Sequence, residues 1–358
     1  MNKSRLIEIV ENFGKARVAV LGDFCLDVIF RGKHVKHSRE SPSSVNRISK
    51  LDYCPGAAAN VAYNLAKLRV GEVAPFTIVG NYVPGSMNFN FGDTLLDLFK
   101  KEGINCKYIL QDDRRPTFAY FKIRARGEGT STVEAEVYRA DLGSSSHLNE
   151  DEIKRLLRTL INPEDDVTPT PYCFFNSLIF SDYGKGIVTP KLFDDLKSRL
   201  GWYIEQDVIK VGTSRENIRM FRNFDLLCLN DYETVSAYKK FDEEERASDA
   251  EVAEYGKLLL AETESRNLIV SRGKDGMTVF ENGEIYSVPT KPKQVVDIAG
   301  AGDTALAAVT AAWSVGATLV EAAKIGNYAA GIVVQKPGTA TASKEEILKE
   351  IQNDGILD

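Results

Sequence analysis

The sequence lacks the cysteine patterns that mark metal or redox sites. Its five cysteines are spread along the chain, and no two of them form a C-x-x-C pair. This spacing argues against a zinc ribbon and against a thioredoxin-type site. Most of the cysteines occupy apolar stretches, as reduced core cysteines do, which favours a cytoplasmic protein. They are Cys25, Cys54, Cys106, Cys173 and Cys228.

Long runs of one residue type are also missing. No window approaches the length of apolar sequence that spans a membrane, and the N-terminus lacks the apolar run of a signal peptide. The chain has no long Lys/Arg run, and its formal net charge is -6. Because nucleic acids and anionic membranes attract basic patches, we expect neither as a partner. A small basic pocket for a phosphorylated metabolite is compatible with this charge.

The sequence does contain a regular alternation of helical and strand patterns. Of its 358 residues, 43% are hydrophobic, which is ample for a large core. Strands that alternate with helices imply a largely parallel sheet covered on both faces. We expect a buried strand that leads into a loop and a second strand over residues 17–30. We expect further strands over 76–80, 173–180, 226–230, 267–271, 277–280 and 285–288, and helices over 56–68, 94–102, 151–160, 190–200, 243–265, 302–315, 319–334 and from 344.

Two segments depart from this alternation. Residues 31–52 are polar, irregular and too long for an ordinary connection, which indicates an insertion or a lid. Residues 117–126 and 131–139 alternate apolar and polar side chains, with Gly127 and Gly129 between them. This pattern predicts a hairpin with one wet face, in a small sheet outside the main core.

We therefore expect a single three-layer α/β/α domain over residues 1–358, with a mostly parallel central sheet. Its small β lid would be formed by residues of about 28–52 and 114–140. An exposed small sheet leaves strand edges and apolar area to cover, so we expect a homodimer that pairs through the lid.

The segment 295–304 carries the most informative motif. It contains the small residues Gly300, Ala301 and Gly302 at the start of an apolar helix. A helix N-terminus has a partial positive charge and free N–H groups, so it suits a phosphoryl group with developing negative charge. Asp303 lies at the same point, where a carboxylate can take the proton from an attacking hydroxyl. The alternative is that Asp303 only caps the helix.

The complete D-x-x-G-A-G-D pattern, from Asp297 to Asp303, resembles the signature of the PfkB family of carbohydrate kinases. Three more matches follow the family's order: Gly22-Asp23 with Asp27 and then P-G-A-A-A-N at 55–60, N-D-Y-E at 230–233, and S-R-G-K-D-G at 271–276. The resemblance covers the chain from Arg17 to about Ile351. It implies a ribokinase-like fold, ATP and Mg²⁺ as cofactors, and Asp303 as the catalytic base.

The resemblance also implies a sugar site near the first strand. Asp27 and Asn60 would bind the sugar hydroxyls, and Gly56 would allow the sugar to approach closely. The family usually has two glycines here, whereas this chain has Gly56 and Ala57, so an extra methyl group could crowd the sugar. Taken alone, Asn60 is better explained as a helix-surface amide and Asp27 as a loop carboxylate.

On the nucleotide side, the resemblance assigns weaker roles. Asn230 and Glu233 match the N-x-x-E motif that helps to place magnesium, with the carboxylate acting through water; a helix cap is the alternative. A monovalent cation, K⁺, would lie beside Asp297. The remaining candidates for nucleotide binding are Ser271, Gly273, Gly276, Asn327 and Gly338.

Finer features are similar to the kinase part of bacterial heptose 7-phosphate kinase/ADP-heptose synthase proteins. They are the runs at 22–27, 55–62 and 180–186. This similarity implies phosphorylation at O1 of a heptose 7-phosphate. Lys185 and Arg139 would then meet the existing phosphate, or else they are solvated surface side chains.

Some features depart from that subfamily. Residues 80–92 replace the usual G-x-D-x-x-G-like loop, the lid segment 38–49 is unusual, and no nucleotidyltransferase region follows residue 351. We therefore expect only the kinase part. A kinase of the same family for another sugar or for a nucleoside, and a non-catalytic sugar-binding protein, stay open as alternatives.

The chain lacks the motifs of two other classes of nucleotide-binding protein. A P-loop needs G-K followed by Ser or Thr, whereas Ala16, Gly186, Leu258 and Asp275 follow the Gly-Lys pairs here. A dinucleotide-dependent dehydrogenase needs G-x-G-x-x-G after the first strand, which ends instead in Gly22-Asp23-Phe24.

Overall fold

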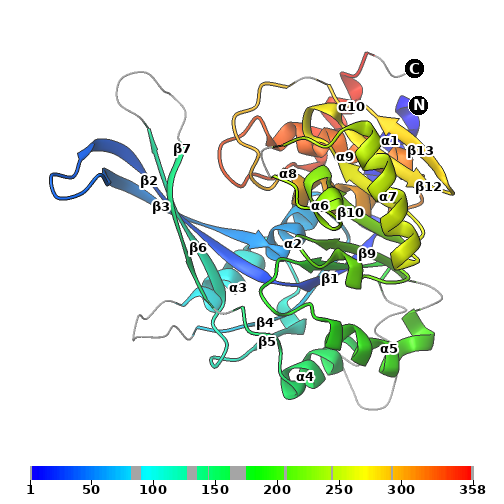
Figure 1. The fold of residues 1–358 in the computed structure, drawn as a ribbon, viewed down its shortest axis with the longest axis horizontal. Coiled ribbons are helices and arrows are strands. Elements are labelled where there is room, and N and C mark those ends of the chain that lie inside the picture. Colours follow the sequence, from blue (N-terminus) through cyan, green and yellow to red (C-terminus); the bar gives the residue numbers. More distant parts are fainter. Residues whose placement is uncertain are drawn as a thin grey trace.

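The computed structural model consists of an α/β body from which a slender β-sheet projects to one side (Figure 1). It describes residues 2–81, 90–126, 135–143, 145–161, 175–204, 208–242, 245–291 and 293–355. The expected turn at Gly127 and Gly129, the position of Cys173 and most of the loop 80–92 lie outside the described residues.

The body is built on one large sheet, in which the described residues form nine strands in the order β13-β12-β11-β10-β9-β8-β1-β4-β5. The strands from β11 to β5 run parallel, and β12 and β13 add an antiparallel hairpin at one edge. The bounds are β1 Arg17–Gly22, β4 Glu72–Val79, β5 Ile109–Gln111, β8 Ser177–Asp182, β9 Ile209–Ser214, β10 Leu226–Asn230, β11 Leu268–Ser271, β12 Met277–Glu281 and β13 Glu284–Val288.

Helices cover both faces of this sheet, and each face has its own apolar core. Along β1, Val18 and Val20 join one core, whereas Ala19 and Leu21 join the other, as the two-residue period of a strand requires. The first core contains α1 (Lys3–Glu11), α2 (Ala58–Lys67), α3 (Phe91–Lys101), α8 (Ala301–Ser314), α9 (Leu319–Val333) and α10 (Lys344–Gln352). The second contains α4 (Glu150–Ile161), α5 (Pro190–Ile204), α6 (Asp231–Ser236) and α7 (Asp249–Thr263).

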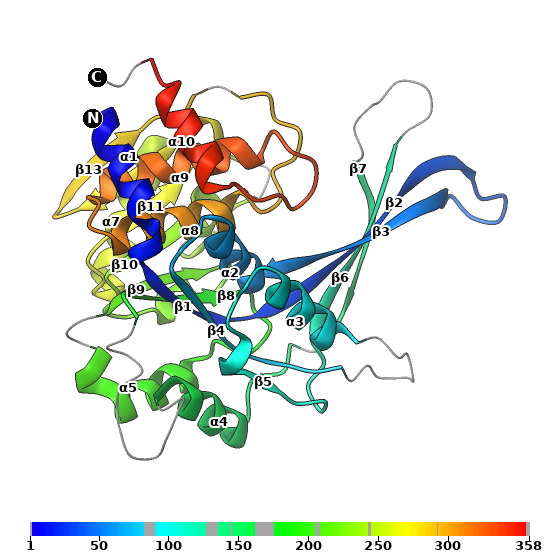
Figure 2. The ribbon, with the colours of Figure 1, turned by 180° about the vertical axis from the view of Figure 1, so that it is seen from behind.

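The projecting sheet is the lid, and its strand order is β3-β2-β6-β7. Its strands are β2 (Phe24–His37), β3 (Ser44–Ala57), β6 (Phe118–Arg126) and β7 (Ala135–Leu142). Seen from behind, the lid again stands clear of the helical layers (Figure 2). The two termini lie together on the body, where Nζ of Lys3 donates to the carbonyl of Gln352 over 3.2 Å.

The expectation that residues 31–52 are irregular was wrong in one respect. Apart from the turn between them, these residues form long antiparallel strands, and β2 also pairs in parallel with β6. Their polarity concealed the strands because a two-stranded arm with water on both faces needs no apolar alternation. Strands β5 and β9 were not expected either, whereas α6 starts where a helix cap at Asn230 was the alternative. Four 3₁₀ segments complete the described structure: η1 (Asn12–Lys15), η2 (Cys106–Tyr108), η4 (Ile218–Met220) and η5 (Gly273–Asp275).

Candidate active site

A cleft of about 600 Å³ opens between the lid and the carboxyl ends of the parallel strands. Open α/β sheets bind ligands at this edge. The cleft brings Asp27 and Asp303 together, although they lie at opposite ends of the sequence. Its lining also includes Gly56, Ala57, Asn60, Tyr120, Lys122, Arg139, Tyr183, Arg215, Glu216, Asn230, Tyr232, Glu233, Ile298, Ala299, Gly300, Gly302 and Thr339.

Asp303 lies in the first turn of α8, and its carboxylate is held from two sides. Nδ2 of Asn60 donates to Oδ2 over 2.8 Å, and the hydroxyl of Tyr183 donates to Oδ1. Burial raises the pKa of Asp303 above its ordinary value, and these two hydrogen bonds offset part of the rise. A fixed carboxylate with a raised pKa is suited to accept a proton.

A chain of hydrogen bonds orients Asn60 toward Asp303. Nδ2 of Asn64 donates to Oδ1 of Asn60 over 3.1 Å, and Oγ1 of Thr304 donates to Oδ1 of Asn64 over 2.9 Å. The amide oxygen of Asn60 is thereby fixed as an acceptor, which leaves Nδ2 to face the carboxylate. The structure therefore shows Asn60 holding the candidate base, in addition to lining the predicted sugar site.

The helix start at Gly300–Asp303 depends on a glycine in a left-handed conformation. Gly300 has a φ of +79°, and a Cβ there would lie 2.9 Å from Nδ2 of Asn60, so a side chain would displace the residue that holds Asp303. The N–H of Ala301 donates to the carbonyl of Ile298 over 3.2 Å. The N–H groups of Gly302 and Asp303 belong to the first turn, where a helix has no partner for them.

Tyr183 reaches Asp303 from a loop that Asp23 holds. The buried Asp23 carboxylate accepts backbone N–H groups from Tyr183 (2.8 Å), Lys185 (3.0 Å) and Ile187 (2.9 Å). Burial nevertheless raises the pKa of Asp23 to about 6. Asp23, which follows the first strand, thus sets the position of the loop that carries Tyr183 rather than lining the cleft.

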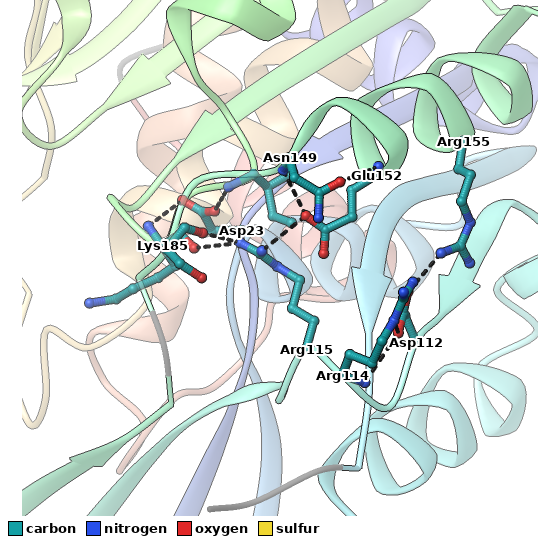
Figure 3. Close-up of polar contacts among 10 residues, drawn as sticks. Asp23, Asp112, Arg114, Arg115, Asn149, Glu152, Arg155 and Lys185 are labelled. Atoms are coloured by element: carbon teal, nitrogen blue, oxygen red, sulfur yellow. Dashed lines mark hydrogen bonds and ion pairs between the residues drawn. The ribbon is translucent and has the colours of Figure 1, made fainter.

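Figure 3 shows the polar network around this loop. The buried Arg115 donates to the backbone carbonyls of Ser146 and Lys185 and pairs with Glu152 over 3.7 Å. Asn149 and Glu152 form a capping box at the start of α4, in which the side chain of each accepts the backbone N–H of the other. A second group, in which Asp112 pairs with Arg114 and Arg155, lies nearby (Figure 3). Arg115 thereby links the loop that carries Tyr183 to the start of α4.

Asp27 lies on β2, where the lid leaves the body. Its Oδ2 accepts from Nζ of Lys122 over 2.7 Å and from Oγ1 of Thr339 over 3.1 Å. A Cβ on Gly56 would lie 2.9 Å from Oδ1 of Asp27, so only glycine leaves this carboxylate in place. Ala57 follows with a φ of 53° and a ψ of -135°, a conformation that glycine adopts easily and that strains other residues.

Three cationic side chains gather around the ring of Tyr120. The distances to the ring centroid are 4.3 Å for Arg139, 5.7 Å for Lys122 and 5.7 Å for Lys185. Arg139 also pairs with Asp141 over 2.7 Å, and Nζ of Lys185 lies 4.1 Å from the ring of Phe118. Lys122 and Arg139 line the cleft, and Lys185 contacts Tyr120, which lines it as well. The lid side of the cleft is therefore positive.

The nucleotide-side residues are brought together only in part. Asn230 and Glu233 line the cleft and also form a capping box, with bonds of 2.6 Å and 2.9 Å, so the structure shows the helix cap, and their role in placing magnesium stays a prediction. Burial raises the pKa of Glu233 to about 7. Ser271 lines a smaller inner pocket of about 90 Å³, which Asp303 and Asn230 border as well.

Other predicted residues lie outside the lining of both pockets. Asn327 is buried and donates to the carbonyl of Val288 over 2.8 Å. Gly273 and Gly276 shape the turn after β11 with positive φ values, and the N–H of Gly338 donates to Oδ2 of Asp297 over 2.9 Å. Their nucleotide-binding roles stay predictions.

Sequence reasoning missed Arg215, Tyr183 and Lys122. Arg215 follows the unexpected strand β9, lines the cleft, and lies 4.8 Å from the ring centroid of Tyr183. In the part of the chain that the structure describes, no carboxylate pairs with it. The stretch V-I-K-V-G before it is a recognisable strand pattern, and a basic residue directly after a parallel strand could have been marked as a site candidate.

The fold and this site together define an ATP-dependent carbohydrate kinase: a candidate carboxylate base, a helix N-terminus and cations converge where the parallel strands end. Comparison with known proteins agrees. The chain matches the pfkB family carbohydrate kinases over residues 15–161 and 212–346, and it belongs to that family. The expected family membership is thereby confirmed, and two solved structures confirm the expected ribokinase-like fold.

Among curated relatives, the chain is 31% identical over 337 residues to the bifunctional protein HldE of Haemophilus influenzae. It is 30% identical over 346 residues to the protein of the same name from Shewanella piezotolerans. These matches cover 94% and 95% of this chain but only 63% and 64% of the relatives, so the chain spans less than two thirds of their length.

Two solved structures show the same fold at low identity. Phosphofructokinase-2 from Escherichia coli, in complex with potassium, matches with a TM-score of 0.70 at 18% identity, covering 94% of this chain and 98% of that one. Ribokinase from Thermotoga maritima matches with a TM-score of 0.66 at 18% identity, covering 94% of this chain and 100% of that one.

Proposed function

We propose that the chain transfers the γ-phosphoryl group of ATP to a sugar that already carries a phosphate, with O1 of a heptose 7-phosphate as the best candidate. The observation that carries this proposal is the group of cations around Tyr120 at the lid side of the cleft. A neutral sugar needs no such charge, whereas a phosphate needs cationic partners when it leaves water. The similarity to HldE supports the heptose.

Lys185 is the best placed of these cations for a phosphate. Lys122 already pairs with Asp27, and Arg139 pairs with Asp141. Among the described residues, no carboxylate pairs with Lys185, whose Nζ lies over the ring of Phe118. An anion at this point would gain a charge-assisted hydrogen bond without breaking an existing ion pair.

In the proposed mechanism, residues that line the cleft orient the sugar, accept its proton and stabilise the transferred phosphoryl group. Asp27 and Thr339 orient the sugar, and Asp303 accepts the proton of its attacking hydroxyl. The bond from that oxygen to the γ-phosphorus forms as the bond to the β,γ-bridging oxygen of ATP breaks, and ADP leaves. The N–H groups of Gly302 and Asp303, with the guanidinium of Arg215, stabilise the negative charge on the transferred group.

The described residues contain no group of three or more His, Cys, Asp or Glu side chains that could hold a metal on their own. Mg²⁺ prefers oxygen ligands, keeps several waters and binds with the substrate's phosphates, so it needs no such cage. Glu233 and Asn230 border the cleft and fit a role through water. Mg²⁺ would supply charge neutralisation for the phosphates of ATP.

A monovalent cation fits less well. Phosphofructokinase-2 was solved with potassium, and Asp297 is the residue that the sequence resemblance assigned to such an ion. In this structure Oδ1 of Asp297 accepts the N–H of Ala299 over 3.0 Å, and Oδ2 accepts Gly338 and the guanidinium of Arg124. Donors thus face both oxygens, and we place no potassium ion on this carboxylate.

The lid favours a homodimer. Its outer strands carry exposed apolar side chains, and an unpaired edge strand of this kind is a site for association. The exposed apolar side chains are Val45, Ile48, Leu51 and Tyr53 on β3 and Val137 and Tyr138 on β7. Light scattering should give a dimer for the native chain and a monomer for Leu51→Glu combined with Tyr53→Glu; a native monomer would exclude this assembly.

The kinase proposal is tested by ADP release over a panel of free and phosphorylated sugars. We expect phosphorylated sugars, heptose 7-phosphate above all, to give the highest kcat/KM, and phosphorus NMR to show a new phosphate on O1. ADP release with free sugars only would contradict the substrate class, and no ADP release with any acceptor would contradict the kinase assignment.

A further inference from the structure

Asp297 joins two loops that border the cleft. Its carboxylate accepts the N–H of Ala299, just before the glycine turn at Gly300, and the N–H of Gly338, next to Thr339. Ala299, Gly300 and Thr339 all line the cleft. The negative charge of Asp297 therefore lies directly behind the segment that presents its N–H groups to the transferred phosphoryl.

The partner of this charge comes from the lid. Arg124 lies on β6, where it pairs in register with Arg31 of β2, and its guanidinium forms an ion pair with Oδ2 of Asp297. The two side chains are only 8% and 12% exposed. Burial alone would raise the pKa of Asp297, but the two N–H groups and Arg124 hold it below its ordinary value. The carboxylate of Asp297 is therefore ionised, and the guanidinium of Arg124 balances its negative charge.

We propose that Arg124 takes the place of a monovalent cation beside the glycine turn at Gly300, so that this kinase works without K⁺. The inference rests on the proposed kinase function. A guanidinium keeps its charge at every working pH and fixes a carboxylate by hydrogen bonds, whereas an ion must be drawn from solution. With the guanidinium in place, a second cation at Asp297 would meet both a like charge and a carboxylate whose oxygens already face donors.

The test compares ADP release in buffers in which tetramethylammonium, Na⁺ or K⁺ is the only monovalent cation. The native chain should show the same kcat in all three, within about twofold. Arg124→Met should lower kcat in tetramethylammonium by roughly tenfold or more, because the ionised Asp297 behind the glycine turn would then lack its counter-charge. Added K⁺ should restore much of that loss, because it can enter the space that the guanidinium left.

Two further variants separate charge from packing. Arg124→Lys keeps a positive charge, so its kcat should stay near that of the native chain without K⁺. Arg126→Ala removes the next arginine of the same strand, an exposed one, and should change neither kcat nor its response to K⁺. Circular dichroism and ATP binding by calorimetry show that each variant is folded.

The outcomes distinguish this inference from the kinase proposal. Activation of the native chain by K⁺ of about tenfold or more would overturn the role of Arg124 and leave the kinase intact. Full activity of Arg124→Met in tetramethylammonium would also overturn it, because no charge would then be needed at Asp297. Absence of ADP release in every salt would contradict the proposed function itself.

Discussion

The hydroxyl of Tyr183 donates a hydrogen bond to Oδ1 of Asp303, the oxygen opposite the one that Asn60 holds. The two residues lie 120 positions apart in the sequence and meet only because the loop after β8 passes the N-terminus of α8. The bond orients the candidate base. It also lowers the pKa of Asp303, against the larger opposing effect of burial.

Tyr183→Phe should therefore change the pH profile as well as the rate. The carboxylate of Asp303 is protonated below its pKa and then cannot accept a proton. Because burial raises that pKa, this loss occurs at a higher pH than for an ordinary aspartate. Activity thus falls as the pH falls through this pKa. Loss of the Tyr183 bond should move this acid limb to higher pH and lower kcat, with the KM for ATP little changed.

The measurement for this variant is kcat against pH, with Tyr286→Phe on the exposed face of β13 as the matched control. An acid limb that stays in place in Tyr183→Phe would show that the hydroxyl does not act on the base.

Substitutions at the last two residues of β3, just before α2, should act on different properties. Gly56→Ala places a methyl group against the Asp27 carboxylate and should raise the KM for the sugar and lower kcat. Ala57→Gly relieves a positive φ and should raise the free energy of unfolding by about 1 kcal/mol, with activity retained. Denaturant unfolding and steady-state kinetics measure both variants. A less stable Ala57→Gly would mean that Ala57 is not strained.

Arg215 should be needed for the chemical step. Its guanidinium lies in the cleft beside Tyr183, so Arg215→Ala should lower kcat by about a hundredfold to a thousandfold, as removal of a charge-stabilising donor does. Binding of ATP and sugar should weaken much less. Arg219→Ala, which breaks a surface ion pair with Glu262, is the control. If Arg215→Ala changed only the KM for the sugar, the arginine would belong to the substrate site instead.

Lys185 should discriminate between acceptors. Lys185→Ala should raise the KM for a phosphorylated sugar by about tenfold to a hundredfold, the cost of one charge-assisted hydrogen bond, and leave the KM for ATP unchanged. Lys191→Ala, on the exposed start of α5, should change neither value. Equal losses with phosphorylated and free sugars would place the phosphate elsewhere.

Much of the fold could be predicted because its helices and buried strands have strong periodic patterns. The strand at Leu226–Asn230 and the hairpin at Met277–Val288 are examples. The lid hairpin was harder, since its strands are mostly polar, face water on both sides and show no regular apolar alternation. Within the described residues, no helix has the length and apolar character needed to cross a bilayer.

The site could be predicted only where chemistry and a motif coincided, as at Asp27, Asn60 and Asp303, which do line one cleft. Tyr183 could not be inferred from local pattern, because its importance comes from a loop that meets Asp303 in space. For Arg215 the local pattern marks only a basic residue after a strand, and its contact with Tyr183 comes from the fold. The ion pair between Arg124 and Asp297 is of the same kind: it joins a lid strand to a loop 173 residues later.

The central claim is that Asp303 is the base of a kinase, and the most direct measurement is single-turnover phosphoryl transfer by Asp303→Asn. This variant should bind ATP normally yet transfer the phosphoryl group about a hundredfold to ten-thousandfold more slowly. Asp249→Asn, at the exposed N-terminus of α7, should transfer at the native rate. Transfer by Asp303→Asn at a rate close to the native one would contradict the account.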